Sequence, residues 1–151
     1  MPFGATIALA VSLAFSGSTS TIQAPILASS FDQSQTVEEY VRDYFADEPI
    51  LAEVASCESH FRQFGKDGKV IKNANSSAVG LFQIMSSIHA SLADEKLGLD
   101  IYSLQGNAAY GRYLYEHQGL KPWEASKACW SKSQAYKDMQ GAKVAIAIAT
   151  K

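Results

Sequence analysis

Apolar and polar residues recur with helical spacing over most of the chain beyond residue 34. Thr36, followed three positions later by Glu39, forms a capping-box pattern that predicts a helix through about Phe45. Pro49 suits the first turn of a second helix, which we expect to run to about His60. The chain therefore begins its folded part with two short helices.

The middle of the chain interrupts this helical pattern. An Asp67-Gly68 turn lies between Phe64 and the apolar pair at residues 70–71, which predicts a small hairpin. The apolar run of residues 80–85 fits either a strand or the start of a helix.

Helical patterns return in the second half of the chain. They cover residues 87–97, ended by Gly98; residues 105–118, ended by Gly119; residues 123–132, preceded by Pro122; and residues 134–148, where the VAIAIA run is ambiguous. We therefore predict an α+β fold that is mostly α, with one small β-hairpin element.

The first 30 residues differ from the rest. Residues 7–15 are apolar, too few to span a bilayer, and typical of the core of a signal peptide. Pro25 disfavours cleavage after Ala24, so we expect a leader over residues 1–28, although it lacks the usual basic start. An uncleaved N-terminal tail is the alternative. This interpretation predicts a secreted or cell-envelope protein with no stable membrane span once the leader is removed.

We assign the folded domain to residues 34–140 and a C-terminal tail to residues 141–151. The composition is that of a globular chain, with 47% hydrophobic and 19% charged residues. The net charge of −2 argues against a nucleic-acid binder. Residues 1–60 hold 8 acids and 1 base, whereas residues 62–151 hold 7 acids and 12 bases. The basic part suits either an anionic polymer or a solvated face.

Cys57 and Cys129 are the two cysteines, and in an exported chain they most simply form one disulfide. Two separate buried thiols are the alternative. Two interpretations have less support. One is a thiol enzyme that uses Cys57 with His60, and the other is a metal site that adds His89 and His117 to His60 and the two cysteines. The spacings match no tight metal-ligand pattern.

Glu58 is the first residue to consider for chemistry. It follows Leu51, Val54 and Ala55 by seven, four and three positions, so it shares their helix face. A carboxyl at the end of an apolar stripe loses hydration, which favours its neutral form. Such an acid can protonate a leaving oxygen. A Glu at the helix edge that reaches solvent is the structural alternative.

Three segments in order resemble the lysozyme-like lytic transglycosylase superfamily. They are Cys57-Glu58-Ser59, then GLFQI at residues 80–84, then NAAYGRYLY at residues 107–115. The resemblance covers roughly residues 50–131. It implies a lysozyme-like fold, in which a helical body and a small β element enclose a cleft for glycan strands.

The resemblance implies roles for individual residues. Glu58 matches the single catalytic acid of the family, and Ser59 matches the serine that contacts the acid or the sugar. Gly80 and Gln83 match the motif that lines the floor of the cleft, where a glycine permits close approach and an amide can bind an amide-bearing sugar.

The aromatic residues of the cleft are less well defined. Tyr113 belongs to the third segment and is expected to contact substrate. The family's Ala-Tyr-Asn motif near the C-terminus is absent, and Ala128-Cys129-Trp130 stands in its place. Trp130 is therefore predicted to form an aromatic wall, with core packing as the alternative.

The implied substrate is peptidoglycan, cleaved at the MurNAc-GlcNAc β-1,4 bond. Hydrolases usually need a second carboxylate, and Asp67, the nearest downstream acid, sits at a turn that explains it. A lytic transglycosylase forming 1,6-anhydro ends is therefore favoured. A lysozyme-type hydrolase and a non-catalytic glycan-binding module stay open. We expect a monomer with no metal or organic cofactor.

Overall fold

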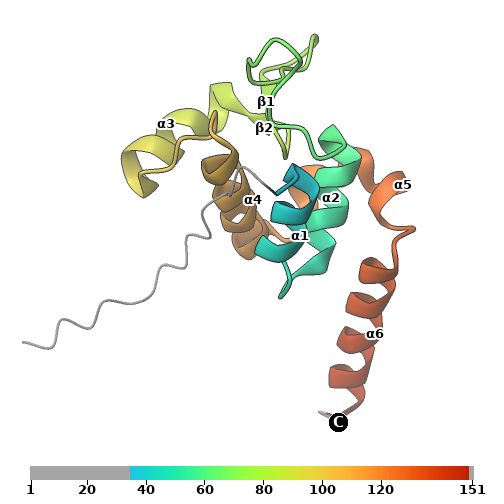
Figure 1. Ribbon diagram of the computed structural model, residues 1–151. Helices are drawn as coiled ribbons and strands as arrows, with labels where there is room; N and C mark the ends of the chain where they lie inside the picture. Colours follow the sequence, from blue (N-terminus) through green and yellow to red (C-terminus); the bar gives the residue numbers. More distant parts are fainter. Residues whose placement is uncertain (1–34, 150–151) are drawn as a thin grey trace, which may run out of the picture.

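The computed structural model describes residues 35–149, which are mostly helical with a small two-stranded antiparallel sheet (Figure 1). The predicted leader at residues 1–28 lies outside the described residues. The elements, in chain order, are α1 (Val37–Tyr44), α2 (Pro49–Ser59), β1 (Ala78–Val79), β2 (Ile84–Met85), α3 (Ser86–Leu97), α4 (Leu104–Gln118), the 3-10 helix η1 (Lys121–Ser126), α5 (Lys127–Trp130) and α6 (Gln134–Ala149). The mostly helical α+β class is thus confirmed.

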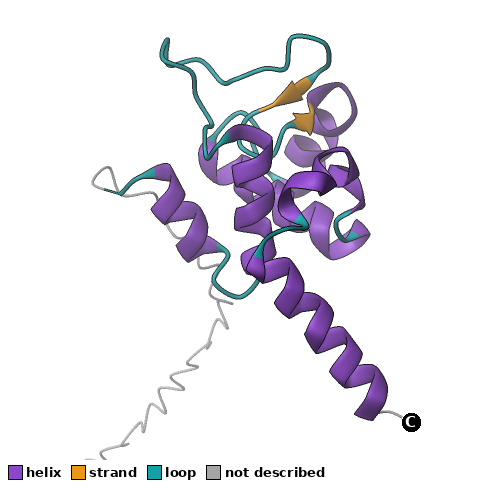
Figure 2. Cartoon of the chain, turned by 90° about the vertical axis from the view of Figure 1, so that its right-hand side faces the viewer, coloured by secondary structure: helices purple, strands orange, loops and turns teal. Residues whose placement is uncertain are grey.

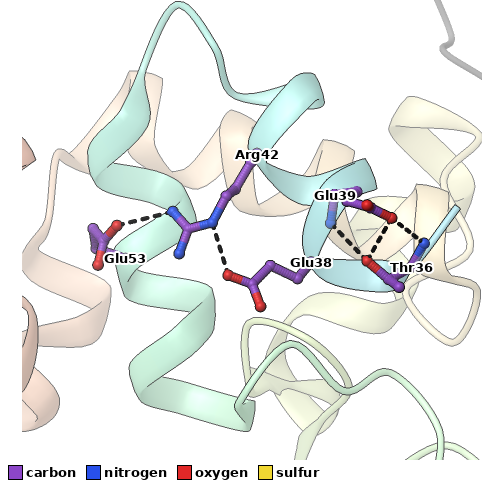
Figure 3. Close-up of polar contacts among 5 residues, drawn as sticks. All are labelled: Thr36, Glu38, Glu39, Arg42 and Glu53. Atoms are coloured by element: carbon purple, nitrogen blue, oxygen red, sulfur yellow. Dashed lines mark hydrogen bonds and ion pairs between the residues drawn. The ribbon is translucent and has the colours of Figure 1, made fainter.

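Helix α1 begins with the predicted capping box. The Thr36 hydroxyl accepts the backbone N–H of Glu39, and the Glu39 carboxylate accepts the backbone N–H of Thr36 (Figure 3). Arg42 on the same helix pairs with Glu38 one turn back and with Glu53 on α2. These contacts start α1 and tie its outer side to α2.

Helix α2 also follows its prediction. Pro49 occupies the first helical position, and His60 ends the helix in the left-handed conformation with φ of 55°. Leu51, Val54 and Ala55 are completely buried. The apolar stripe found in the sequence therefore faces the core, and it leads to Glu58 in the last turn.

The β structure differs from the expected hairpin. Around the Asp67-Gly68 turn there is a single bridge between Phe64 and Val70, and the two-stranded sheet instead pairs β1 with β2. Only the last two residues of the 80–85 run form strand. The other four make a turn, because buried side chains from elsewhere in the chain bind its backbone, as described below.

The later helices agree with the pattern except in one place. Gly98 and Gly119 end α3 and α4 as predicted. The single helix expected over residues 123–132 is wrong. The 3-10 helix η1 comes first and α5 follows it, and Trp123 inside η1 has non-helical backbone angles. Trp123 is 3% exposed and its indole N–H donates to the Phe82 carbonyl, so burial of this ring breaks the helix.

One hydrophobic core joins the helices, with Phe82 near its centre. The Phe82 ring packs edge-on against Phe45 and close to Trp123. It lies so near Gly111 of α4 that a Cβ there would come within 2.7 Å of the ring. Helix α6 runs away from this body in both views (Figures 1 and 2), and residues 141–149 continue it. Among residues 35–149, no helix has the length and apolar character needed to cross a membrane.

Candidate active site

Glu58 lies in the last turn of α2, where η1 and α5 pack against that helix (Figure 1). Its side chain is half-buried, and the Ser126 hydroxyl of η1 donates a 2.6 Å hydrogen bond to its Oε1 atom. Burial raises the pKa of the Glu58 carboxyl above its ordinary value, and the Ser126 hydrogen bond opposes that rise in part. This half-buried acid is the group that the apolar stripe predicted.

A disulfide between Cys57 and Cys129 fixes the elements that carry these two groups. The predicted bond is confirmed, with the two Cα atoms 6.0 Å apart. Cys57 precedes Glu58 by one residue, and Cys129 follows Ser126 by three. The bond therefore links the end of α2 to α5 beside the acid. The bond also excludes a thiol enzyme, and a metal site with cysteine ligands, in this state, since neither cysteine is free.

Ser126 was missed by the sequence analysis. Nothing in the KPWEAS segment distinguishes this serine locally. The available signal was the cysteine pairing, because a bond between Cys57 and Cys129 brings their near neighbours together. Residues within one helical turn of a disulfide on two helices are natural contact partners, and Glu58 and Ser126 fit that relation.

Ser59 does not take the place that the resemblance implied. It is 2% exposed, and its hydroxyl donates to the Ala55 carbonyl and accepts the backbone N–H of Arg62. The hydroxyl is therefore used inside the protein, and its partners are backbone groups rather than the acid. Its role is to close the end of α2 and turn the chain toward Arg62.

Gly80 and Gln83 form the turn between β1 and β2. Gly80 has φ of 69° and Gln83 has φ of 49°. The Gln83 side-chain amide donates to the Gly80 carbonyl at 2.9 Å, and Gln83 itself is half-exposed. Gly80 is buried. These residues therefore shape the turn between the two strands.

Two buried side-chain amides, those of Gln63 and Asn107, bind the backbone of this turn. The Gln63 side chain accepts the Leu81 N–H at 2.7 Å, and the Asn107 side chain accepts the Phe82 N–H at 2.9 Å. Both amides also donate to the Ile101 carbonyl. Gln63 and Asn107 are 1% and 0% exposed, so their hydrogen bonds are shielded from water. Asn107 belongs to the third sequence segment, whereas Gln63 was not singled out.

Gly80→Ala is expected to destabilise the protein by about 3 kcal/mol, combining the strain of a left-handed alanine with overpacking. A Cβ at Gly80 would lie 2.4 Å from Gln63 Oε1 and 2.6 Å from Asn107 Nδ2. Gly68→Ala is the matched control, because Gly68 has φ of 73° and no atom within 4 Å of its Cβ position. Urea unfolding should show the larger loss for Gly80→Ala. Equal losses in the two variants would mean that the amide pair gives way freely.

The two aromatic residues predicted to contact substrate, Trp130 and Tyr113, lie in different surroundings. Trp130 is 2% exposed, its indole N–H donates to the Trp123 carbonyl, and its ring packs against Tyr136. The structure therefore has Trp130 packed in the core, which was the alternative given for it. Tyr113 is half-buried on α4, between the rings of Tyr110 and His117.

Asp67, the second carboxylate that a hydrolase would need, is exposed on the long loop before β1. Its Oδ1 atom accepts the backbone N–H of Lys69, two residues ahead. This is the short-range contact of an Asx turn. The turn accounts for Asp67 without any catalytic role.

Three cavities have linings that do not include Glu58. One of about 420 Å³ lies between α3 and the loop before α4, and it is lined by Ala90, Leu99 and Tyr102 among others. Two of about 610 and 580 Å³ lie beside α6, and both are lined by Tyr115 and Met139. Glu58 lines none of these three. Within residues 35–149, no cluster of three or more His, Cys, Asp or Glu side chains is arranged to hold a metal ion.

Comparison with known proteins adds no relative. No family model, no curated protein and no solved structure matches the chain.

Proposed function

We propose that this protein is a peptidoglycan-cleaving enzyme of lysozyme-like fold, which breaks the MurNAc-GlcNAc β-1,4 bond with Glu58 as general acid and then base. One observation carries the proposal. Glu58 ends the buried stripe of α2, with its carboxyl half-buried, its pKa raised, and one oxygen bound to Ser126. Burial of this kind favours the protonated form of a carboxyl, which is the form that a general acid needs.

The proposed reaction has two proton transfers through the same carboxyl. Glu58 first gives its proton to the glycosidic oxygen, and the bond between that oxygen and C1 of MurNAc breaks. The resulting carboxylate then takes the proton of the sugar's own 6-hydroxyl as that oxygen bonds to C1. The products are a GlcNAc 4-hydroxyl and a 1,6-anhydro-MurNAc end. Glu58 finishes protonated, and no water is consumed.

A lytic transglycosylase is favoured over a lysozyme-type hydrolase because this route needs one carboxylate. Hydrolases of the common kind place two carboxylates roughly 5–10 Å apart across the bond. Asp67 is the nearest downstream acid, and it is engaged in its own exposed turn. The hydrolase is the second candidate, and it would require the Asp67 loop to approach bound substrate.

The disulfide supports an exported enzyme. Disulfides persist in oxidising compartments, including the periplasm and the outside of the cell. Together with the apolar run at residues 7–15, the Cys57–Cys129 bond favours the cell envelope, where glycan strands are found. The proposed partner is therefore peptidoglycan, bound by a monomer that uses no cofactor.

Mass spectrometry of digested, purified peptidoglycan tests the proposal. We expect soluble muropeptides whose MurNAc ends are one water lighter than reducing ends, because the 1,6-anhydro ring forms without hydrolysis. Reducing ends would identify a hydrolase. Binding of peptidoglycan without any release would contradict the enzyme and favour a glycan-binding module.

A further inference from the structure

The Ser126 hydroxyl faces two acceptors with only one proton to donate. Its Oγ atom lies 2.6 Å from Glu58 Oε1 and 3.1 Å from the Trp123 carbonyl oxygen. A serine hydroxyl has one O–H donor and two lone pairs. It therefore donates to one of these oxygens at a time, and its lone pairs stay free to accept.

The hydrogen bond to Glu58 suits both protonation states of that carboxyl. When Glu58 is ionised, Ser126 donates to Oε1 of the carboxylate. When Glu58 is protonated on Oε2, its Oε1 atom is the carbonyl oxygen and still accepts from Ser126. No covalent bond changes between the two states except the O–H bond on Oε2.

We propose that Ser126 is the positioning residue for the acid-base chemistry of Glu58, donating to Oε1 in both protonation states so that the exchangeable proton is carried by Oε2. The inference rests on the proposed function, because the choice of oxygen matters only if Glu58 gives that proton to substrate. Oε2 is then the oxygen left for substrate. Ser126 acts through Glu58 and touches no reacting atom.

Both partners of Ser126 are fixed in place. The Trp123 carbonyl also accepts the Trp130 indole N–H at 3.0 Å. Trp123 itself is anchored through its indole N–H to the Phe82 carbonyl. On the other side, the Cys57–Cys129 bond holds α2 against α5. The distance between Glu58 and Ser126 is therefore set by buried contacts and a covalent link.

Charged groups on the surrounding elements do not compete for Glu58. Arg42 of α1 pairs with Glu38 and Glu53. Lys127 of α5 pairs with Glu124 of η1. The side chain of Arg62, just beyond α2, donates to the Ser59 carbonyl.

Other titratable groups on the elements packed against α2 include His60 at its end, Lys121 of η1, and Tyr136, Lys137, Asp138 and Lys143 of α6. Among the described residues, burial raises the pKa of Glu58 above its ordinary value, and the Ser126 hydrogen bond offsets that rise in part. Ser126 is thus the group whose change should move that pKa.

The test compares Ser126→Ala and Ser126→Thr with wild type in the full chain. Carbon-13 NMR titration of the Glu58 carboxyl, assigned with Glu58→Gln, reads the hydrogen bond without substrate. Removing a donor that stabilises the carboxylate should raise the Glu58 pKa in Ser126→Ala, and the threonine hydroxyl should restore it. An unchanged Glu58 pKa in folded Ser126→Ala would overturn the assignment. Ser91→Ala, an exposed serine on α3, is the control that should change nothing.

Peptidoglycan cleavage gives the second readout. We expect kcat of Ser126→Ala to fall about ten-fold, as for loss of one charge-assisted hydrogen bond, with KM nearly unchanged. The activity should also persist to higher pH, because Glu58 must be protonated to act as acid and its pKa has risen. A rise in KM with an unchanged kcat would contradict a positioning role. An inactive wild type with a Ser126-dependent titration would reject the proposed function while supporting the hydrogen bond itself.

Discussion

Glu58→Gln is expected to lower the rate of peptidoglycan cleavage by about 100- to 10,000-fold, the range for loss of a general acid-base group. Glutamine has nearly the same shape as glutamate and can still accept from Ser126, but it cannot give a proton to the glycosidic oxygen. The rate is measured as release of soluble muropeptides. Binding to insoluble peptidoglycan should be retained, since the substitution removes only the proton.

Two controls make this result interpretable. Glu95→Gln removes an exposed carboxylate on α3 and should leave the rate unchanged. Thermal unfolding at neutral pH should show no loss of stability in Glu58→Gln. Burial disfavours the ionised form of Glu58, so the wild type becomes less stable as pH rises from the unfolded pKa through the raised folded pKa. The glutamine of Glu58→Gln does not ionise, so the variant does not lose stability over that pH range. Cleavage at the wild-type rate by Glu58→Gln would refute the mechanism.

Removing the disulfide with Cys57→Ser/Cys129→Ser is expected to lower the free energy of unfolding by up to about 4.4 kcal/mol, from the chain-entropy cost of its loop. The bond joins residues 72 positions apart. Because typical domains are stable by only about 5–15 kcal/mol, this loss is a large part of the total. Urea unfolding measures it directly.

The same change should loosen the contact between Glu58 and Ser126. We expect the double variant to lose activity at temperatures where it remains folded, since α2 and α5 are then held by packing alone. Dithiothreitol should reproduce both effects in the wild type, where Cys129 is exposed, and should leave the double variant unchanged. Equal stability with and without the bond would show that the core alone holds these helices together.

Much of the fold was predictable because its causes are local. The capping box of Thr36 and Glu39, Pro49 at the start of α2, and Gly98 and Gly119 after α3 and α4 act within one or two turns of the chain. Each satisfies backbone groups that the helix end leaves free. Their effects follow from neighbouring residues, so the sequence order is sufficient to find them.

The errors share a different cause. The turn at residues 80–83 depends on Gln63 and Asn107, which lie 18 and 25 positions away from their partners Leu81 and Phe82. The break at Trp123 depends on a bond to the Phe82 carbonyl, 41 positions away. Trp130 looked suitable for a cleft because an aromatic ring suits both a sugar and a core. No local pattern distinguishes these outcomes.

By itself, the sequence determined most of the helical framework, since helix caps and periodicity act at short range. It also indicated the disulfide pair and the half-buried acid, each beside an alternative that the structure then decided. Tertiary structure alone decided that Ser126, rather than Ser59, faces Glu58. It also decided where the strands pair and that Trp130 is buried. The physical reason is that each of these depends on which distant atoms satisfy a buried polar group or fill the core.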